Sequence, residues 1–179
     1  MIKLTDILLE SPMKKLRVFD FDDTIAKSNS RVKITHKNGS VSFLTPAQYS
    51  VYDKKDGDVS DYSEFKQLIE PREIKSIVKI LRNFYNAGGQ RTITILTARG
   101  VTKPIEKFMN TIGIKNIEVV ALDNSDPQKK ANWIEDMIKN KGYTDVFFID
   151  DSEKNVRAVS ALKMKYPNVR WNIRLAKYK

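Results

Sequence analysis

Short apolar runs alternate along this chain with longer stretches in which apolar residues recur every three or four positions. Such runs are typical of strands buried within a sheet, and the helical spacing indicates amphipathic helices. The expected strands are residues 16–19, 93–96, 117–122, 146–149 and, at an edge, 169–173; the expected helices are residues 71–87, 103–112, 130–140 and 155–165. Strands that alternate with helices predict parallel βαβ units, and hence an α/β fold with a doubly wound, Rossmann-like parallel sheet.

A different pattern interrupts this rhythm after the first strand. Alternating residues flank Asn38 and Gly39, a strong signal for a tight hairpin, so residues 31–44 are predicted as a β-hairpin. Pro46 predicts a short helix, because proline is favoured at the first helical position. Residues 53–63 are polar and are expected to form a loop. The insertion therefore separates the first strand from the rest of the sheet.

Composition agrees with a globular chain. The 179 residues suit a single domain, and the contents of 41% hydrophobic and 30% charged residues exclude an intrinsically disordered protein. No apolar stretch is long enough to span a bilayer, and residues 1–9 are predicted as a surface helix and not a signal peptide. The absence of cysteine excludes thiol nucleophiles, disulfides and thiolate zinc sites, and it favours a cytoplasmic location. The opening residues are reminiscent of short tailed-phage proteins, which would place the chain in a host cytoplasm.

The formal net charge of +10 bears on possible partners. A basic balance favours polyanions such as nucleic acid. Lysine-rich surfaces also keep proteins soluble without any partner, and the basic residues form no single run. Both interpretations stay open at this point, and nothing in the sequence indicates an oligomeric state.

Carboxylates gather at the ends of two expected strands. Asp20, Asp22 and Asp23 follow residues 16–19, and a second acidic pair at positions 150–151 follows residues 146–149. Ligands bind at the carboxyl ends of strands in open α/β sheets. Crowded carboxylates repel one another and need a cation or shared protons, and oxygen-rich sites suit Mg²⁺. The alternative is a solvated turn that caps a helix, but the recurrence of the pattern favours one shared metal site.

The order of the polar residues resembles the four motifs of the haloacid dehalogenase (HAD) superfamily of phosphatases. The segment Asp20-Phe-Asp22-Asp23-Thr24 is similar to the first motif, DxDxT, and an apolar run ending in Thr97 is similar to the second. The third and fourth motifs are matched by Lys129 or Lys130 and by the pair Asp150-Asp151. Phosphorylated receiver domains use similar residues in another order, and the absence of a GxxxxGK[ST] loop argues against a P-loop nucleotidase.

The resemblance implies how the chain is organised and what it does. A single domain over residues 1–179 would have a core of residues 14–27 and 70–179, with a flap hairpin and a small cap at about residues 28–69. Asp20 would attack phosphorus and become an aspartyl phosphate. Asp22 would protonate the leaving oxygen and then activate water. Thr97 and a lysine would bind the phosphate oxygens.

The resemblance also implies a Mg²⁺ ion as cofactor. Its ligands would be Asp20, the backbone carbonyl of Asp22, Asp150 and Asp151, the last directly or through water. Asp151 has an alternative role as a charge at a helix N-terminus, with Ser152 as the cap.

Several residues near these motifs have two interpretations each. Lys130 is favoured over Lys129 as the third-motif lysine, because its helical spacing to the apolar positions 134, 137 and 138 directs it towards the sheet; Lys129 would lie beside the substrate. Arg99 could clamp a substrate phosphate or form a structural ion pair. Thr97 could cap a turn, and Asn155 could reach the water shell of the metal or face solvent.

The remaining residues of interest favour structural roles. His36, in the hairpin turn, is predicted as a surface histidine and not a ligand. Trp133 is predicted as a core residue. The aromatic side chains of the insertion are more typical of a small satellite core than of a base-stacking platform; they are Tyr49, Tyr52, Tyr62 and Phe65.

A small cap leaves a site open to bulky substrates. Together with the basic balance, this favours phosphate removal from nucleic-acid 3′ ends or nucleotides, in which the chain loosely resembles the phosphatase part of phage polynucleotide kinase-phosphatases. The alternatives are a small-metabolite phosphatase with the same mechanism and a non-catalytic binding module on the same fold. The complete set of motif residues argues against the binding module.

Overall fold

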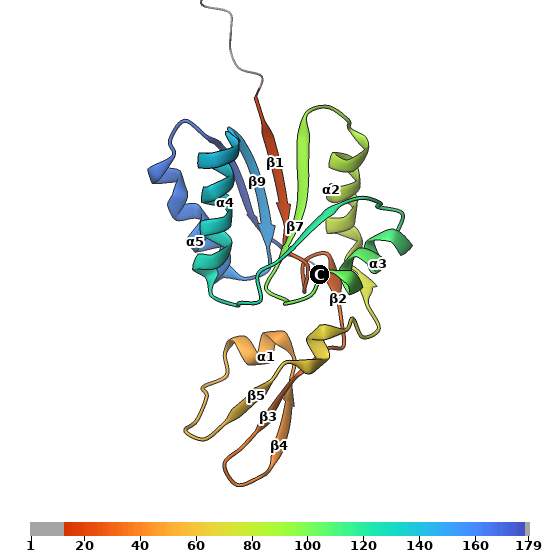
Figure 1. The fold of residues 1–179 in the computed structure, drawn as a ribbon, viewed down its shortest axis with the longest axis vertical. Helices are drawn as coiled ribbons and strands as arrows, with labels where there is room; N and C mark the ends of the chain where they lie inside the picture. Colours follow the sequence, from red (N-terminus) through yellow and green to blue (C-terminus); the bar gives the residue numbers. More distant parts are fainter. Residues whose placement is uncertain (1–12, 178–179) are drawn as a thin grey trace, which may run out of the picture.

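A five-stranded parallel sheet forms the centre of the computed structural model, which describes residues 13–177. The strand order is β10-β9-β1-β7-β8 (Figure 1). The strands are β1 (Lys15–Phe19), β7 (Arg91–Thr97), β8 (Glu118–Ala121), β9 (Asp145–Asp150) and β10 (Arg170–Leu175), and the helices between them are α2 (Lys75–Asn86), α3 (Lys103–Thr111), α4 (Pro127–Lys141) and α5 (Glu153–Lys165). The predicted α/β class with a parallel sheet is confirmed, and β10 is an edge strand as expected.

Two apolar clusters cover the two faces of this sheet. In β1, Leu16 and Val18 pack with buried residues of α4 and α5, whereas Phe19 packs with buried residues of α2 and α3. Figure 1 shows α4 and α5 on one side of the strands and α2 and α3 on the other. Because successive side chains of a strand point to opposite faces, an apolar run such as that of β1 supplies both clusters. Trp133 is partly buried against the α4–α5 cluster, as predicted.

The register of the central strand determines where the polar residues emerge. Phe19, the last residue of β1, is aligned with Ile95 of β7 and with Ile149 of β9. The residues that follow these positions therefore leave the sheet at one edge. Asp20 is tied there by its backbone N–H, which donates to the Ile149 carbonyl at 3.0 Å.

Small antiparallel sheets occupy the insertion after β1. Strand β2 (Ala26–Lys27) pairs with β6 (Arg72–Glu73), and a three-stranded sheet of order β4-β3-β5 lies beyond this pair, below the large sheet in Figure 1. Its elements are β3 (Val32–Thr35), β4 (Val41–Leu44), α1 (Pro46–Ser50), β5 (Val59–Asp61) and the 3₁₀ turn η2 (Ser63–Lys66). The hairpin and the short helix are confirmed; Thr45 caps α1 in a capping box with Gln48.

Two predictions in the insertion are wrong. The expected loop over residues 53–63 contains β5, which pairs with the free edge of β3. The helix expected from Pro71 begins at Lys75, because residues 72 and 73 pair with β2 first. Both strands form through pairing with distant segments, which local composition does not reveal. The helix predicted over residues 1–9 lies outside the described residues.

The polar and aromatic side chains of the insertion form a small network. His36 is half-buried, and its ring nitrogens contact Asp58 Oδ1 at 2.9 Å and Ser42 Oγ at 2.8 Å. The histidine therefore links β4 to the segment just before β5, and it is partly buried and not a simple surface residue. The rings of Tyr52 and Tyr62 pack against Tyr49, as expected for a satellite core, whereas Phe65 lies against the core arginine Arg99. No helix within residues 13–177 is long and apolar enough to cross a bilayer.

Candidate functional site

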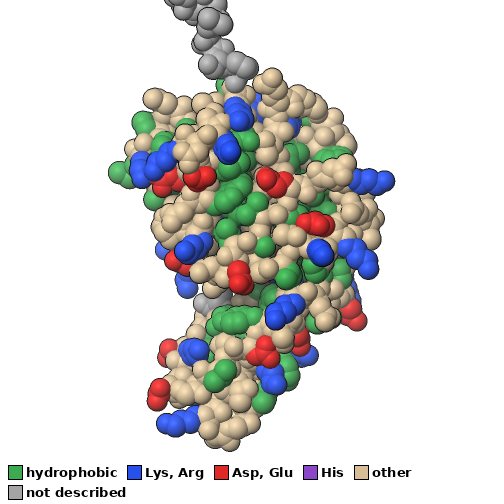
Figure 2. Space-filling model, in the orientation of Figure 1, with side chains coloured by type: hydrophobic (Ala, Val, Ile, Leu, Met, Phe, Trp, Pro, Cys, Tyr) green, Lys and Arg blue, Asp and Glu red, His purple; other side chains and the backbone are tan. Residues whose placement is uncertain are grey.

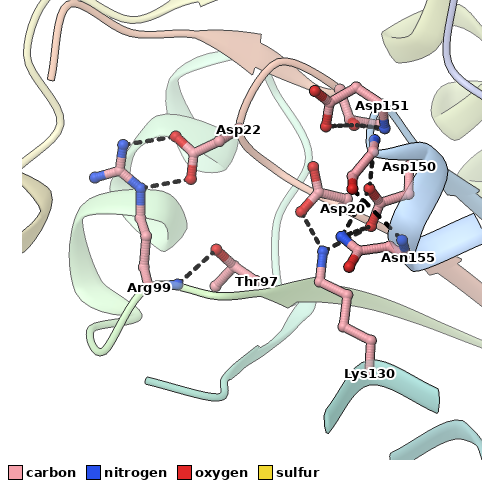
Figure 3. A network of polar contacts seen from close by, with 10 residues as sticks. Asp20, Asp22, Thr97, Arg99, Lys130, Asp150, Asp151 and Asn155 are labelled. Atoms are coloured by element: carbon pink, nitrogen blue, oxygen red, sulfur yellow. Dashed lines mark hydrogen bonds and ion pairs between the residues drawn. The ribbon is translucent and has the colours of Figure 1, made fainter. Parts of the chain in front are cut away.

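Three carboxylates from two distant segments meet at the carboxyl edge of the sheet. Carboxylate oxygens of Asp20, Asp150 and Asp151 all lie within 4.8 Å of one another. Asp20 follows β1 and Asp150 ends β9 (Figure 3). These two are buried, while Asp151 is partly open to solvent. Oxygen donors in this arrangement could hold a metal ion. The predicted convergence of the two acidic segments is therefore present in the fold.

Lys130 lies between the two buried carboxylates. Its Nζ donates to Asp20 Oδ1 at 2.6 Å and to Asp150 Oδ2 at 2.7 Å. The lysine belongs to the first turns of α4, which begins at Pro127 with Asp126 as the N-cap, and only 3% of the residue is exposed. Lys129, one position earlier, is exposed and makes no such contact. The structure thus brings Lys130, and not Lys129, to the acidic residues.

The acids outnumber the cation within this cluster, and the pKa values reflect the imbalance. Burial, opposed by Lys130 and reinforced by the neighbouring carboxylates, raises the pKa of Asp20 well above its ordinary value. Partial burial and the charges of Asp150 and Asp23 raise the pKa of Asp151 to about 6. Burial alone would lower the pKa of Lys130, but Asp20 and Asp150 raise it instead. A cluster of three carboxylates with one ammonium is deficient in positive charge, which a divalent cation would supply.

Hydrogen bonds fix the orientation of the second acidic pair. The Asn155 side-chain amide donates to both carboxylate oxygens of Asp150, each at 3.0 Å, and the backbone N–H of Ser152 donates to Asp150 Oδ1 at 2.9 Å. Asn155 therefore supports Asp150, a role that the sequence did not indicate. Ser152 caps α5, as the alternative interpretation of Asp151 suggested, and Thr24 Oγ1 accepts a hydrogen bond from the backbone N–H of Asp151 at 3.0 Å.

The Asp22 side chain is turned away from the acidic cluster. It forms a bidentate pair with Arg99, whose Nε and Nη2 lie 2.8 and 2.7 Å from the two carboxylate oxygens (Figure 3). The same guanidinium donates to Ser28 Oγ and to the backbone carbonyls of Phe65 and Gln67. Arg99 is 4% exposed. Of the two interpretations for Arg99, the structure contains the structural ion pair.

Thr97 ends β7 at the same edge of the sheet. It is fully buried, and its Oγ1 accepts a hydrogen bond from the backbone N–H of Arg99 at 3.1 Å. This bond is the turn-capping role considered for Thr97. Because a hydroxyl can accept and donate at once, this contact leaves the hydroxyl hydrogen for another acceptor, such as a phosphate oxygen.

Five residues were predicted to meet at the carboxyl edge of the sheet, and the structure places all of them at that edge: Asp20, Thr97, Lys130, Asp150 and Asp151. The backbone carbonyls that accept hydrogen bonds from Arg99 lie in residues 65–67 of the insertion, and this contact was not predicted. No sequence signal connects a guanidinium to carbonyls more than thirty positions away.

Comparisons of the chain with models of known families, with curated proteins and with solved structures found no match.

Proposed function

We propose that the protein is a Mg²⁺-dependent phosphatase of the HAD type, with the doubly wound fold of that family, which hydrolyses phosphoric monoesters through an aspartyl phosphate on Asp20. The observation that carries the proposal is the position of Asp20. It is a buried carboxylate at the carboxyl edge of the central strand, bonded to Lys130 and within reach of Asp150 and Asp151. The order of the motifs along the chain supports the same family.

The donor set fits a hard divalent cation. Asp20, Asp150 and Asp151 offer oxygen ligands only, as Mg²⁺ prefers. When bound, the metal would offset the repulsion between the Asp20 carboxylate and an approaching phosphate. The charge deficit of the cluster supports this assignment.

In the proposed reaction, a carboxylate oxygen of Asp20 attacks phosphorus, and the bond between phosphorus and the leaving oxygen breaks. The leaving oxygen takes a proton from Asp22. In the second half, Asp22 takes a proton from water, whose oxygen attacks the aspartyl phosphate and releases inorganic phosphate and free Asp20. Lys130 and the Thr97 hydroxyl stabilise the negative charge on the transferring group.

The role of Asp22 requires a change from the conformation described above. Its carboxylate is held by Arg99, so it must turn towards Asp20 to exchange a proton with the leaving group.

The test is the variant Asp20→Asn, which keeps the size of the side chain and removes the nucleophile. We expect it to release no phosphate from p-nitrophenyl phosphate in Mg²⁺, while far-UV circular dichroism shows an unchanged fold. Asp56→Asn serves as the control, because this acid is fully exposed in the insertion. A wild-type rate in Asp20→Asn would refute the role of Asp20, and a wild-type protein that hydrolyses no phosphomonoester would refute the proposed function.

A further inference from the structure

A groove of about 480 Å³ lies between helix α3 and the segment that returns from the insertion to the core. Its walls carry three lysines: Lys103 and Lys107 from α3, and Lys66 from the end of η2. Its apolar floor includes Leu68, Pro104 and Phe108. The volume is in the range of pockets that hold small molecules or one residue of a polymer.

The lysines that line this groove form no ion pair with an acid of the described residues. The described residues that line the groove include no acid. The hydrogen bonds of Ser63, then the charge of Lys33 and last that of Lys66 lower the pKa of Asp61, but Asp61 does not line the groove. Lys103 and Lys107 are one helical turn apart and repel each other. An anion between the walls would relieve this repulsion.

The lysines of the groove are more closely grouped than the charged side chains on the face drawn in Figure 2. Figure 2 shows the Lys and Arg side chains of one face scattered over the core and the insertion, with Asp and Glu side chains among them. In the groove, three cations face a common space above apolar side chains. Cations that follow a phosphate backbone, together with aromatic side chains on which bases stack, are typical of sites for single-stranded nucleic acid, and Phe108 is the aromatic residue among those that line the groove.

The groove also adjoins the candidate catalytic site. Gln67, which lines the groove, accepts a hydrogen bond through its carbonyl from Arg99 Nη1 at 2.6 Å, and Arg99 holds Asp22. The Arg99 side chain therefore connects the wall of the groove to the proposed general acid.

We propose that this groove binds the backbone of a single-stranded nucleic acid whose terminal phosphate lies at Asp20; the inference rests on the proposed phosphatase function. Lys66, Lys103 and Lys107 contact phosphodiester groups, and the apolar floor supports a base. The substrate class of the site is then a phosphorylated polynucleotide end.

The experiment measures the binding of a fluorescein-labelled, 3′-phosphorylated single-stranded oligonucleotide by fluorescence anisotropy in the Asp20→Asn background, so that no turnover occurs. The groove triple variant is Lys66→Ala, Lys103→Ala and Lys107→Ala. The control triple variant removes the same charge from exposed lysines elsewhere: Lys75→Ala, Lys79→Ala and Lys163→Ala. Thermal unfolding checks the fold of both, and the single variant Lys107→Glu repeats the test with one exposed residue changed.

We expect the groove triple to weaken binding about 10-fold or more and to reduce the slope of log K against log[salt] by about 2, as the loss of three phosphate contacts with a single strand predicts. The control triple should weaken binding less than about threefold, and Lys107→Glu should weaken it in the same direction as the groove triple. Equal weakening in the two triples, or no binding by the parent protein, would overturn the inference. Equal affinity for poly-glutamate would overturn it in favour of an acidic protein partner. If the groove triple weakens binding as expected but the wild-type protein hydrolyses no phosphomonoester, the proposed function alone would be refuted.

Discussion

Lys130→Met tests the electrostatic balance at the sheet edge most directly. The substitution keeps an unbranched side chain and removes the ammonium that lies 2.6 Å from Asp20 Oδ1 and 2.7 Å from Asp150 Oδ2. Both carboxylates are almost completely buried, at 5% and 0% exposure, so water cannot replace the lost charge. The substitution leaves the buried carboxyl groups of Asp20 and Asp150 close together without the ammonium between them.

The expected cost follows from this burial. Removal of one partner from a buried ion pair typically costs about 3–5 kcal/mol. The two pairs share one ammonium, so the cost is counted once. In a chain of this size each kcal/mol lowers Tm by about 2–4 °C, which predicts a fall of about 6–20 °C in the absence of divalent ions.

Lys129→Met is the matched control, since it makes the same chemical change at an exposed neighbouring position. Its free energy of unfolding should change by no more than about 0.5 kcal/mol. The assay is thermal unfolding of both variants in EDTA and in Mg²⁺, followed by their rates with p-nitrophenyl phosphate.

We expect Mg²⁺ to raise the Tm of Lys130→Met more than that of the wild type, because a bound cation supplies part of the missing charge. Lys130→Met should also lose phosphatase activity, and Lys129→Met should keep it. Equal Tm values for the two variants in EDTA would refute the electrostatic reasoning. Loss of activity in Lys129→Met alone would refute the assignment of the lysine.

Two further predictions concern other ion pairs. Arg99→Lys cannot reproduce the bidentate contact with Asp22 together with the bonds to two carbonyls; it should lower stability by about 2–4 kcal/mol in urea unfolding and slow phosphate release. Hydrogen bonds from Lys165, Tyr166 and Lys139 lower the pKa of Glu135 from 4.5 to about 2, so its contribution to stability is present above pH 4.5 and is lost as the pH falls towards 2. Glu135→Gln should therefore cost about 1–2 kcal/mol at pH 7, after allowance for the exposed lysines, and almost nothing at pH 2 in the same urea assay. An equal cost at both pH values would contradict this linkage.

The parallel sheet could be predicted because its signals are local. The run at 146–149 is apolar throughout, and β9 is buried along its whole length. The helical period of residues 75–86 likewise identified the buried face of α2, although not its first residue. Strand β5 has no such signal: residues 59 and 61 are exposed, and the strand is held by pairing with β3, a contact that depends on the fold of the entire insertion.

Some contacts of the candidate site could likewise be predicted from the sequence, and others could not. The recurrence of an acidic pair after an apolar run predicted that Asp20 and Asp150 meet, and the parallel pairing of β1 with β9 brings both to one edge. The helical register was enough to favour Lys130 over its neighbour. The contact between Asp22 and Arg99 spans 77 positions and depends on how the loop after β7 turns, so the sequence left Arg99 with two interpretations.

Under the proposed mechanism, the structural ion pair with Asp22 and the clamp on a substrate phosphate are successive states of Arg99. All of the hydrogen-bond donors of the Arg99 guanidinium are used, and two of the bonds go to Asp22. When Asp22 turns towards Asp20, Nε and Nη2 each lose an acceptor in a buried position, which is costly unless another acceptor replaces the carboxylate. A substrate oxygen is the natural replacement, because a phosphate offers the same bidentate geometry. The remaining bonds to Phe65 and Gln67 would hold the guanidinium in place during this exchange, so the insertion, through two carbonyls, would prepare Arg99 to receive the substrate.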